Sequence, residues 1–521
     1  MGTQPWYRSL ISLVLSSLLF PPLGWVLLWI RPTLGIFKKL LGTAFLAVLS
    51  IAHLHFFFGL QLELDGTGMR PILSFHSPSK HYANLEKHRS GQEEGSQQTD
   101  SLLAAPEAAA ATLRAQPAEM AESSTSAATS PASADHPSPD WPEFRGPHRD
   151  SRYDSRSIRT RWPAEGLPLL WRQPSGGGYA SFVVADGLFF TIEQRRQQEV
   201  AVAYDLETGR EVWTQPWNAE FRETMGGDGP RATPTWDEGR LYVLGATGEL
   251  HCFEAGSGRT IWNLNILADN GAKNLQWGMS AAPLVLGEKL IVLPGGGSGR
   301  SVGAYHKLTG KPIWKSLSDK QSYASPIRAE LAGLEQIIII SAVRVAGLGI
   351  DDGALLWEYP WQTEFDINAA EPLVVDENRI FVSSGYGHGS VLLNISRTNG
   401  EFKVSPVWET KRMKNKFNGS VLEKGHLYGL DEGILACLDV ETGELKWKGG
   451  RYGYGQLLLA SGHLIILTEK GDLVLVEASP EEHRELARFS AIQGKTWNYP
   501  AITEGRLLVR NTTEMACFDL R

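Results

Sequence analysis

The chain of 521 residues carries a formal net charge of −8 and has a pI near 6.0. This acidic balance excludes the broadly basic surface that binds nucleic acid. The three cysteines form no C-x-x-C-H sequence, which excludes covalently attached c-type haem. Because H-E-x-x-H and G-x-S-x-G sequences are also missing, the sequence offers no paired metal ligands and no hydrolase nucleophile. We therefore expect no nucleic-acid partner and no metal site.

Two apolar runs open the chain, at Leu10–Ile30 and Leu40–Leu60. Each has about twenty residues, the length that a helix needs to cross a hydrocarbon core. No small-residue cleavage site follows either run, so the sequence predicts a retained anchor of two transmembrane helices over residues 1–65, with no signal peptide removed. Pro21 and Pro22 leave open whether the first run spans the membrane or bends within it.

Positive charge between the two runs indicates the orientation of this anchor. Arg31, Lys38 and Lys39 lie in the connection, whereas Glu63 and Asp65 follow the second run. Because positively charged connections stay in the cytoplasm, we expect the rest of the chain on the outer side of the membrane.

Residues 66–140 are interpreted as a linker. From Ser77 onward they are rich in Ala, Ser, Glu, Gln and Pro. Such a composition buries too little apolar surface to fold, so we expect a disordered tether. The basic stretch that follows has two interpretations, in which it lies against lipid headgroups or solvates the first strand of the folded domain. Its arginines are Arg145, Arg149, Arg152, Arg156, Arg159 and Arg161.

A phrase of about eleven residues recurs through the rest of the chain, with clear copies at 203–213 (AYDLETGREVW) and 437–447 (CLDVETGELKW). Each copy predicts a strand, a tight turn and a second strand. The acid can accept hydrogen bonds from the turn amides, and the Gly supplies a positive φ. The second strand carries a Trp, and these residues recur 39 to 52 positions apart: Trp171, Trp213, Trp262, Trp314, Trp357, Trp408 and Trp447.

The two ends of this repeat array are complementary. Trp171 lies in a second strand with no first strand before it, whereas the closing MACFDLR is a first strand with no second strand after it. Four strands in about 45 residues is the spacing of a propeller blade, and joining the ends removes exposed sheet edges. We predict an all-β domain over residues 141–521: an eight-bladed β-propeller of four-stranded antiparallel blades, its blade count open by one.

The repeat ends in D-x-x-T-G-x-x-x-W and resembles the pyrroloquinoline-quinone-like (PQQ-like) β-propeller repeat. The opening WPEFRGPHRD at 141–150 is similar to the start of a bacterial subgroup of that family. The resemblance implies that the Trp of each copy docks between blades. Together with the anchor, it predicts a propeller on the periplasmic or outer side of the inner membrane of a bacterium. The family holds quinoprotein dehydrogenases as well as an outer-membrane-assembly lipoprotein that only binds other proteins, so function must be argued from a site.

Three cysteines, Cys252, Cys437 and Cys517, stand two residues before the turn acid of their copies. Equivalent positions of different blades are too far apart for a disulfide, which requires close Cα atoms. We therefore predict that they are small buried packing residues.

A PQQ-dependent dehydrogenase is the enzyme that the resemblance implies, with the quinone on the propeller axis and Ca²⁺ held by Glu, Asn and Asp. This chain lacks the adjacent cysteine pair of many such enzymes, and its domain of about 380 residues is shorter than theirs. No converging set of oxygen ligands for Ca²⁺ can be identified. We expect no cofactor, and keep PQQ with Ca²⁺ as the alternative.

Residues at the starts of blades are the remaining candidates for binding, because they should gather at one mouth of the channel. Alternatively, they cap inner strands and pack against neighbouring blades. We predict a membrane-tethered periplasmic scaffold that binds an envelope protein or peptide and is not an enzyme; the alternative is a PQQ-dependent dehydrogenase oxidising alcohols or sugars. The candidates are Trp277, Asp366, Asn368, Glu371, Lys416, Asn418 and Trp497.

Overall fold

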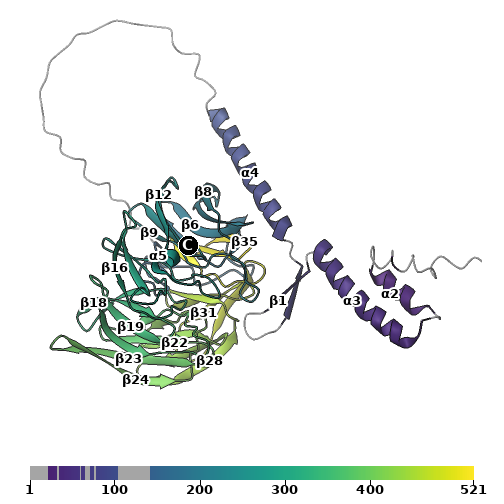
Figure 1. Ribbon diagram of the computed structural model, residues 1–521. Coiled ribbons are helices and arrows are strands. Elements are labelled where there is room, and N and C mark those ends of the chain that lie inside the picture. The colour runs from purple at the N-terminus through teal and green to yellow at the C-terminus, as the bar shows by residue number, and fades with distance from the viewer. Residues whose placement is uncertain are drawn as a thin grey trace, which may run out of the picture. The chain divides into compact units, whose positions relative to one another are not determined.

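The computed structural model describes residues 14, 21–31, 34–58, 60–64, 71–75, 78–103 and 141–521. The chain divides into two compact units. The first comprises Met1–Asn84 with Glu223–Gly227, and the second comprises Leu85–Arg222 with Asp228–Arg521. The second unit contains the β-strands of the propeller (Figure 1).

Two helices and a hairpin are described in the first unit. Helix α2 (Pro21–Trp29) precedes α3 (Ile36–Phe58), and strands β1 (Leu60–Leu64) and β2 (Pro71–Phe75) pair antiparallel. Within the described ranges, one helix is long and apolar enough to cross a membrane, over Ile36–His55. The prediction of two transmembrane helices is therefore not confirmed, because α2 has only nine residues and the first half of the first apolar run, apart from Val14, lies outside the described residues.

Helix α4 (Pro78–Leu103) lies where the sequence predicted a linker without regular structure. From Leu85 onward it belongs to the same unit as the propeller. Composition alone missed this helix because polar contacts with the propeller hold it, as described below. Residues 104–140 of the expected linker lie outside the described residues.

Eight sheets of antiparallel strands make up the propeller. Blade 1 holds β5 (Val183–Ala185), β6 (Leu188–Arg195), β7 (Gln198–Asp205) and β8 (Glu211–Trp217). Blade 2 holds β9 (Thr235–Asp237), β10 (Arg240–Leu244), β11 (Glu249–Glu254) and β12 (Thr260–Asn265). Blade 3 follows the short helix α5 (Ile266–Asn270) and holds β13 (Leu284–Leu286), β14 (Lys289–Val292), β15 (Val302–His306) and β16 (Pro312–Ser316). Blade 4 holds β17 (Ile327–Leu331), β18 (Leu334–Ile340), β19 (Arg344–Gly349) and β20 (Leu355–Pro360).

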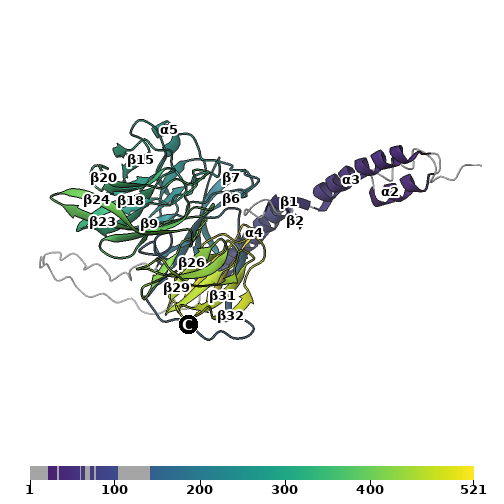
Figure 2. The same cartoon turned by 90° about the horizontal axis from the view of Figure 1, so that it is seen from below.

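The remaining blades continue the same order around the ring (Figure 2). Blade 5 holds β21 (Leu373–Val374), β22 (Arg379–Ser384), β23 (Gly389–Thr398) and β24 (Glu401–Thr410). Blade 6 holds β25 (Val421–Glu423), β26 (His426–Asp431), β27 (Ile434–Asp439) and β28 (Leu445–Arg451). Blade 7 holds β29 (Gln456–Ala460), β30 (His463–Leu467), β31 (Asp472–Glu477) and β32 (Glu485–Ser490), and β3 (Arg152–Tyr153) adds a fifth strand. Blade 8 holds β33 (Ala501–Thr503), β34 (Arg506–Arg510), β35 (Glu514–Asp519) and β4 (Leu169–Pro174).

Blade 8 closes the ring with strands from both ends of the domain. Strand β35 pairs antiparallel with β4, and Cys517 lies opposite Trp171 in this ladder. Buried residues of β35 and of β6 in blade 1 accordingly share one hydrophobic cluster. The predicted eight-bladed propeller of four-stranded antiparallel blades is confirmed.

The repeated phrase connects neighbouring blades through its Trp. The Trp171 Nε1 atom of blade 8 donates to the Leu206 carbonyl of blade 1 at 3.0 Å, and Trp213 Nε1 of blade 1 donates to Ala255 O of blade 2 at 2.8 Å. Equivalent bonds join Trp262 to Lys307, Trp314 to Ile350, Trp408 to Val440 and Trp447 to Ser479.

Trp357 departs from this pattern, because its Nε1 atom donates to Gln336 Oε1 of its own blade at 2.6 Å. The following blade has an extended hairpin of ten-residue strands, β23 and β24, in place of the usual tight turn.

The three cysteines are free and buried. Cys252 and Cys437 lie opposite Trp262 and Trp447 in their ladders, as Cys517 lies opposite Trp171. Burial raises the pKa of the Cys437 thiol to about 11, which keeps it protonated. These surroundings agree with the predicted role of the three cysteines as small buried packing residues.

Candidate functional site: the axial channel

Residues 141–153, which we call the plug, run along the innermost strands of the propeller. Trp141 forms an antiparallel bridge with Val184 of β5, and the Pro142 carbonyl accepts a hydrogen bond from Trp236 N of β9 at 2.9 Å. At the other end of the plug, β3 pairs in parallel with β29. The plug therefore supplies backbone partners to inner strands that would otherwise be edges.

Arg149 joins three blades through its guanidinium. Its Nη1 atom donates to Pro326 O of the blade 3–4 connection at 2.9 Å, and its Nη2 atom donates to Pro283 O just ahead of blade 3. Nη2 also lies 3.4 Å from Thr235 Oγ1 of blade 2, and Nε pairs with Glu143 within the plug. The planar fork of arginine suits such a set of converging acceptors.

Arg145 makes the corresponding contacts on the other side of the channel. Its Nη2 atom donates to Ser420 O ahead of β25 at 3.0 Å, and its Nη1 atom lies 3.7 Å from the Glu371 carboxylate ahead of β21. Its guanidinium lies 5.6 Å from the ring centroid of Tyr499, ahead of β33. Both arginines are almost completely buried.

The arginines at the start of the domain therefore do not form one surface stretch. Arg145 and Arg149 crosslink the interior of the ring, and Arg152 donates to Leu422 O of β25 at 2.6 Å. Only the later members are exposed, such as Arg156. The expectation that this stretch faces lipid or solvent is wrong for Arg145, Arg149 and Arg152. Their guanidiniums bind carbonyls in or just ahead of the inner strands, and composition alone could not identify these partners.

Three of the predicted mouth residues have structural partners instead of converging on the axis. Asp366 forms an ion pair with Lys320 at 3.3 Å, and its other oxygen accepts from Gln362. Asn368 is buried and donates to the Ser341 and Trp361 carbonyls. Glu371 faces the plug through Arg145 and accepts from the Ser325 amide. Of these three residues, Glu371 contacts the plug, whereas Asp366 and Asn368 bind groups of the loops around them.

The other predicted residues approach one another at the mouth from which the inner strands start. Trp497 packs against Phe417 with ring centroids 4.8 Å apart, and Lys416 Nζ lies 4.6 Å from the Tyr454 ring centroid. Asn418 is buried below them and donates to Gly455 O at 3.2 Å. Trp277 lies apart from this group and packs against Tyr323 with centroids 5.7 Å apart.

A continuous cluster of rings and cations surrounds Trp497, and we call it the collar. Tyr179 lies 5.4 Å from Trp497, and Tyr454 lies 5.7 Å from Phe417, measured between centroids. Lys495 Nζ lies 4.4 Å from the Trp497 centroid, within the range of a cation–π contact. The collar consists of Tyr179, Lys416, Phe417, Tyr454, Lys495 and Trp497.

Sequence reasoning missed most collar residues, although a signal for them exists. Tyr179, Tyr323, Phe417 and Trp497 each stand four residues before the first residue of their inner strand. Aligning the blades on the inner strand, instead of on the Trp of the second outer strand, would have placed these aromatic residues in one ring.

The axial residues do not fit a quinone with calcium. Calcium requires several converging oxygen ligands, whereas Asp366, Asn368 and Glu371 each point to a different partner. Across the described ranges, no group of three or more His, Cys, Asp or Glu side chains is placed to share a metal ion. A pocket of about 540 Å³ beside the plug is lined by five carboxylates and two guanidiniums, an acidic surrounding that disfavours the carboxylates of PQQ.

An eight-bladed β-propeller whose inner strands are joined by the plug is thus the class of fold. A family described as outer membrane protein assembly factor BamB matches residues 196–449. The propeller belongs to the PQQ-like β-propeller repeat family, as the repeated phrase predicted.

Curated relatives of two kinds share this repeat. The chain is 26% identical over 203 residues to a quinohemoprotein alcohol dehydrogenase of Comamonas testosteroni, covering 37% of this chain but only 27% of that protein. It is 20% identical over 312 residues to the outer membrane protein assembly factor BamB of Shewanella oneidensis, covering 56% of this chain and 75% of that protein. With BamB of Moranella endobia the identity is 23% over 255 residues, covering 47% and 64%.

Solved structures agree on the fold. The crystal structure of the Comamonas testosteroni quinohemoprotein alcohol dehydrogenase superposes with a TM-score of 0.57 at 14% identity, covering 73% of this chain and 80% of that one. BamB from Moraxella catarrhalis superposes with a TM-score of 0.50 at 15% identity, covering 68% and 98%. Identities this low support the architecture alone.

Proposed function

We propose that the protein is a membrane-tethered scaffold whose propeller binds an envelope protein or peptide at the collar. The proposal is based on what the axial residues bind. Glu371 and the inner-strand carbonyls hold Arg145 and Arg149 of the plug, so the chemistry at the centre of the ring stabilises the propeller.

The composition of the collar supports a protein partner. Trp, Tyr and Arg are the residues that contribute most at protein interfaces, because they combine large apolar faces with polar atoms. The collar brings Trp497, Tyr179 and Tyr454 together with two lysines, and Arg231 lies 5.3 Å from the Tyr179 centroid. The similarity to BamB, named as an assembly factor of the outer membrane, points the same way.

We place the anchor in the inner membrane of a bacterium. Helix α3 supplies one apolar segment of sufficient length, and Lys38 and Lys39 lie in its first turn. By the positive-inside rule these lysines stay cytoplasmic, so the propeller works on the periplasmic side.

Site-specific crosslinking tests the proposal. A photoreactive phenylalanine analogue replaces Trp277, which lies at the same mouth as the collar but outside it. In a separate variant it replaces Ile313, which is 43% exposed on the outer strand β16. In cells, the variant at position 277 is expected to crosslink a discrete envelope protein that the variant at 313 does not. Equal crosslinking from both positions, or from neither, contradicts a partner at this mouth.

A PQQ-dependent dehydrogenase remains the second candidate, favoured by the similarity to the Comamonas testosteroni enzyme. A ligand that binds the folded state at a hundredfold excess over its Kd stabilises it by about 2.7 kcal/mol. We expect no change in Tm on adding PQQ and Ca²⁺, and no dye reduction with an alcohol or aldose. A rise in Tm together with dye reduction would establish the enzyme and exclude the proposed scaffold.

A further inference from the structure

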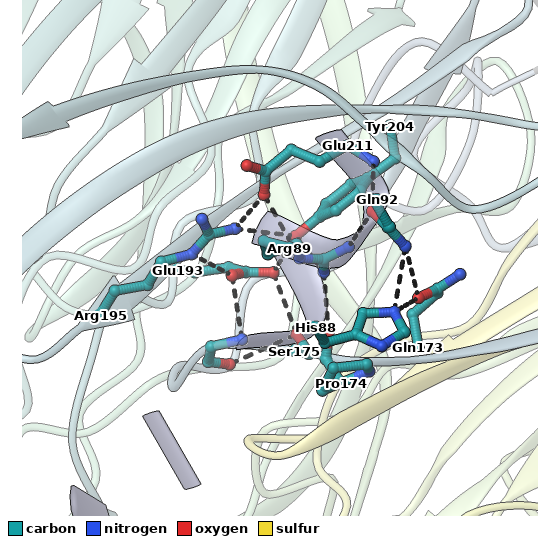
Figure 3. A network of polar contacts seen from close by, with 11 residues as sticks. His88, Arg89, Gln92, Gln173, Pro174, Ser175, Glu193, Arg195, Tyr204 and Glu211 are labelled. Carbon is teal, nitrogen blue, oxygen red and sulfur yellow. Dashed lines mark hydrogen bonds and ion pairs between the residues drawn. The ribbon is translucent and has the colours of Figure 1, made fainter. Parts of the chain in front are cut away.

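Helix α4 docks on the seam between blades 8 and 1, where the ring closes (Figure 3). The seam is formed by β4 of blade 8 and by β7 and β8 of blade 1. Among the helix residues whose side chains are described, Leu85 and Arg89 are the buried ones. The contact is therefore mainly polar, and one arginine lies at its centre.

Arg89 is recognised by four different groups of the seam. Its guanidinium lies over the Tyr204 ring, 4.9 Å from the centroid, and its Nη2 atom donates to Pro174 O at 2.8 Å. Its Nε atom lies 3.5 Å from the Glu211 carboxylate, and Nη2 lies 3.4 Å from the Tyr204 hydroxyl. A ring face, a carbonyl and a carboxylate together match the planar, charged fork of arginine.

A fully buried carboxylate lies behind this arginine. Tyr204 donates to Glu193 at 2.7 Å, and Arg195 bridges Glu193 at 3.0 Å and Glu211 at 2.7 Å. Burial by itself raises the pKa of Glu193, but the charges of Arg195, Arg510 and Arg89 outweigh it and lower the pKa to about 2. Glu193 therefore stays ionised and fixes the Tyr204 hydroxyl that Arg89 meets.

Polar contacts on either side of Arg89 set the register of the helix. Gln92 Nε2 donates to Gln173 Oε1 at 3.0 Å, and His88 also bonds this oxygen. Arg210 Nη2 donates to Gln92 O at 2.8 Å. One turn earlier, Glu86 accepts two bonds from Arg196, at 2.6 and 2.8 Å.

The receptor for Arg89 occurs at this seam alone among the eight blades. Tyr204 and Glu211 are paired in the ladder of β7 and β8. No other blade combines an aromatic hydroxyl with a carboxylate at the matching pair. The equivalent pairs are Phe253–Thr260, Tyr305–Pro312, Leu348–Leu355, Leu393–Pro406, Leu438–Leu445, Val476–Glu485 and Phe518–Leu169.

We propose that the seam between blades 8 and 1 is a specific docking site for an arginine-bearing helix, and that α4 is its resident, releasable occupant. The docking depends on one inserted side chain and a few polar bonds, and Leu85 is the single buried apolar residue among the α4 side chains that are described. It therefore opens without unfolding of the blades. A segment held this way sits at the low end of the local stabilities within one protein.

Release of α4 changes the reach of the tether, a consequence that rests on the proposed membrane anchoring. While Arg89 is docked, the helix residues from Leu85 onward are held on the propeller and add nothing to the distance that it can travel. When α4 is released, these residues join the chain that links the anchor to the propeller and lengthen it. The seam thus controls how far the propeller extends toward a partner.

Amide hydrogen exchange on the full-length protein in detergent tests the docking. Residues 80–92 are expected to be protected in the wild type, and Arg89→Ala or Glu211→Gln should speed their exchange by about ten- to a hundredfold. Lys87→Ala is the matched control, because it removes a cation from an exposed position of the same helix. Unchanged exchange in both seam variants overturns the proposal, as does equal acceleration in Lys87→Ala. Protection of β30 in the same spectra reports whether the blades stay folded.

Exchangeability is tested with a labelled peptide of residues 78–95. It should bind the full-length Arg89→Ala protein at least about tenfold more tightly than the wild type, whose site is occupied. A peptide carrying the Arg89→Ala change should not bind either protein. Equal binding of both peptides, or no binding to the variant protein, overturns a site that reads arginine. Neither readout involves a membrane or an envelope partner, so these results stand apart from the proposed function.

Discussion

The Trp and the Gly of the repeated phrase contact each other across a blade boundary. A Cβ atom on Gly209, Gly258 or Gly443 would lie 2.6 to 2.7 Å from the ring of the preceding blade's Trp. The Gly therefore serves two purposes, since it adopts a positive φ in the turn and leaves room for the neighbouring indole. This explains why the phrase keeps both residues at a constant offset.

Two glycine substitutions separate these effects. Gly443→Ala combines a left-handed φ of 72° with a contact 2.7 Å from Trp408, whereas Gly425→Ala has a φ of 77° and open space around its Cβ. We expect Gly425→Ala to lower the free energy of unfolding by about 1–2 kcal/mol and Gly443→Ala by about 2–4 kcal/mol. Urea denaturation measures both values, and equal losses would show that the indole contact contributes nothing.

A buried acid makes stability depend on pH near neutrality. Glu199 lies between blades 1 and 2 and accepts from Ala246 N and Trp217 Nε1, and burial raises its pKa to about 7. The folded state thus binds a proton that the unfolded chain releases above about pH 4.5. Stability therefore falls as pH rises from about 4.5 to 7, by on the order of 3 kcal/mol.

Glu199→Gln is expected to abolish this dependence of the free energy of unfolding on pH. The variant and the wild type should differ least in stability near pH 5. Denaturation curves between pH 5 and 8 provide the measurement. Parallel pH profiles for the two proteins would mean that Glu199 does not titrate in this range.

At the scale of elements, the plug acts as an internal crosslink. Arg149 alone contacts carbonyls ahead of blades 3 and 4 and a hydroxyl of blade 2. If the guanidinium were lost, Pro326 O would lose its donor, whereas Pro283 O would keep only the bond from Thr235 Oγ1. Leaving a buried carbonyl without its donor is a larger penalty than the gain from making the bond.

Arg149→Lys tests this crosslink, because lysine keeps the charge but lacks the planar fork. We expect a loss of about 2–4 kcal/mol in the free energy of unfolding. Arg156→Lys, at an exposed position of the following segment, serves as the control and should change stability by less than about 0.5 kcal/mol. A similar small loss for both variants would refute a structural role for the guanidinium of Arg149.

The sequence predicted elements well where a local pattern repeats and poorly where a partner lies far along the chain. The turn at Asp205 accepts from Thr208 N at 2.8 Å, as the phrase indicated. By contrast, nothing local marks Arg145 or Arg149 as channel residues, because the Ser420 and Pro326 carbonyls that they bind lie more than a hundred positions away. Helix α4 was missed for the same reason, since its stability depends on Tyr204 and Glu211.

On the scale of the whole molecule, closure joins the two ends of the domain through the ladder of β4 and β35. Removing residues 514–521 takes away β35 and leaves β34 and β4 with unpaired backbone groups. We expect this truncation to lower Tm by on the order of 10 °C or more, or to prevent folding. Removing the exposed Arg521 alone should have little effect. Thermal melts followed by circular dichroism provide the comparison, and a truncated protein that melts like the wild type would show that closure is dispensable.

The plug also has a consequence for how the protein is made. A ribosome produces residues 141–153 before any blade and reaches β35 only after all the others, so β5, β9 and β29 each find a backbone partner already made on the same chain. If translation stops before Glu514, the nascent chain contains the plug and the earlier strands but lacks β35, so the ring stays open. Such a product exposes unpaired strand edges and is a substrate for proteases, which would clear incomplete copies before they could act.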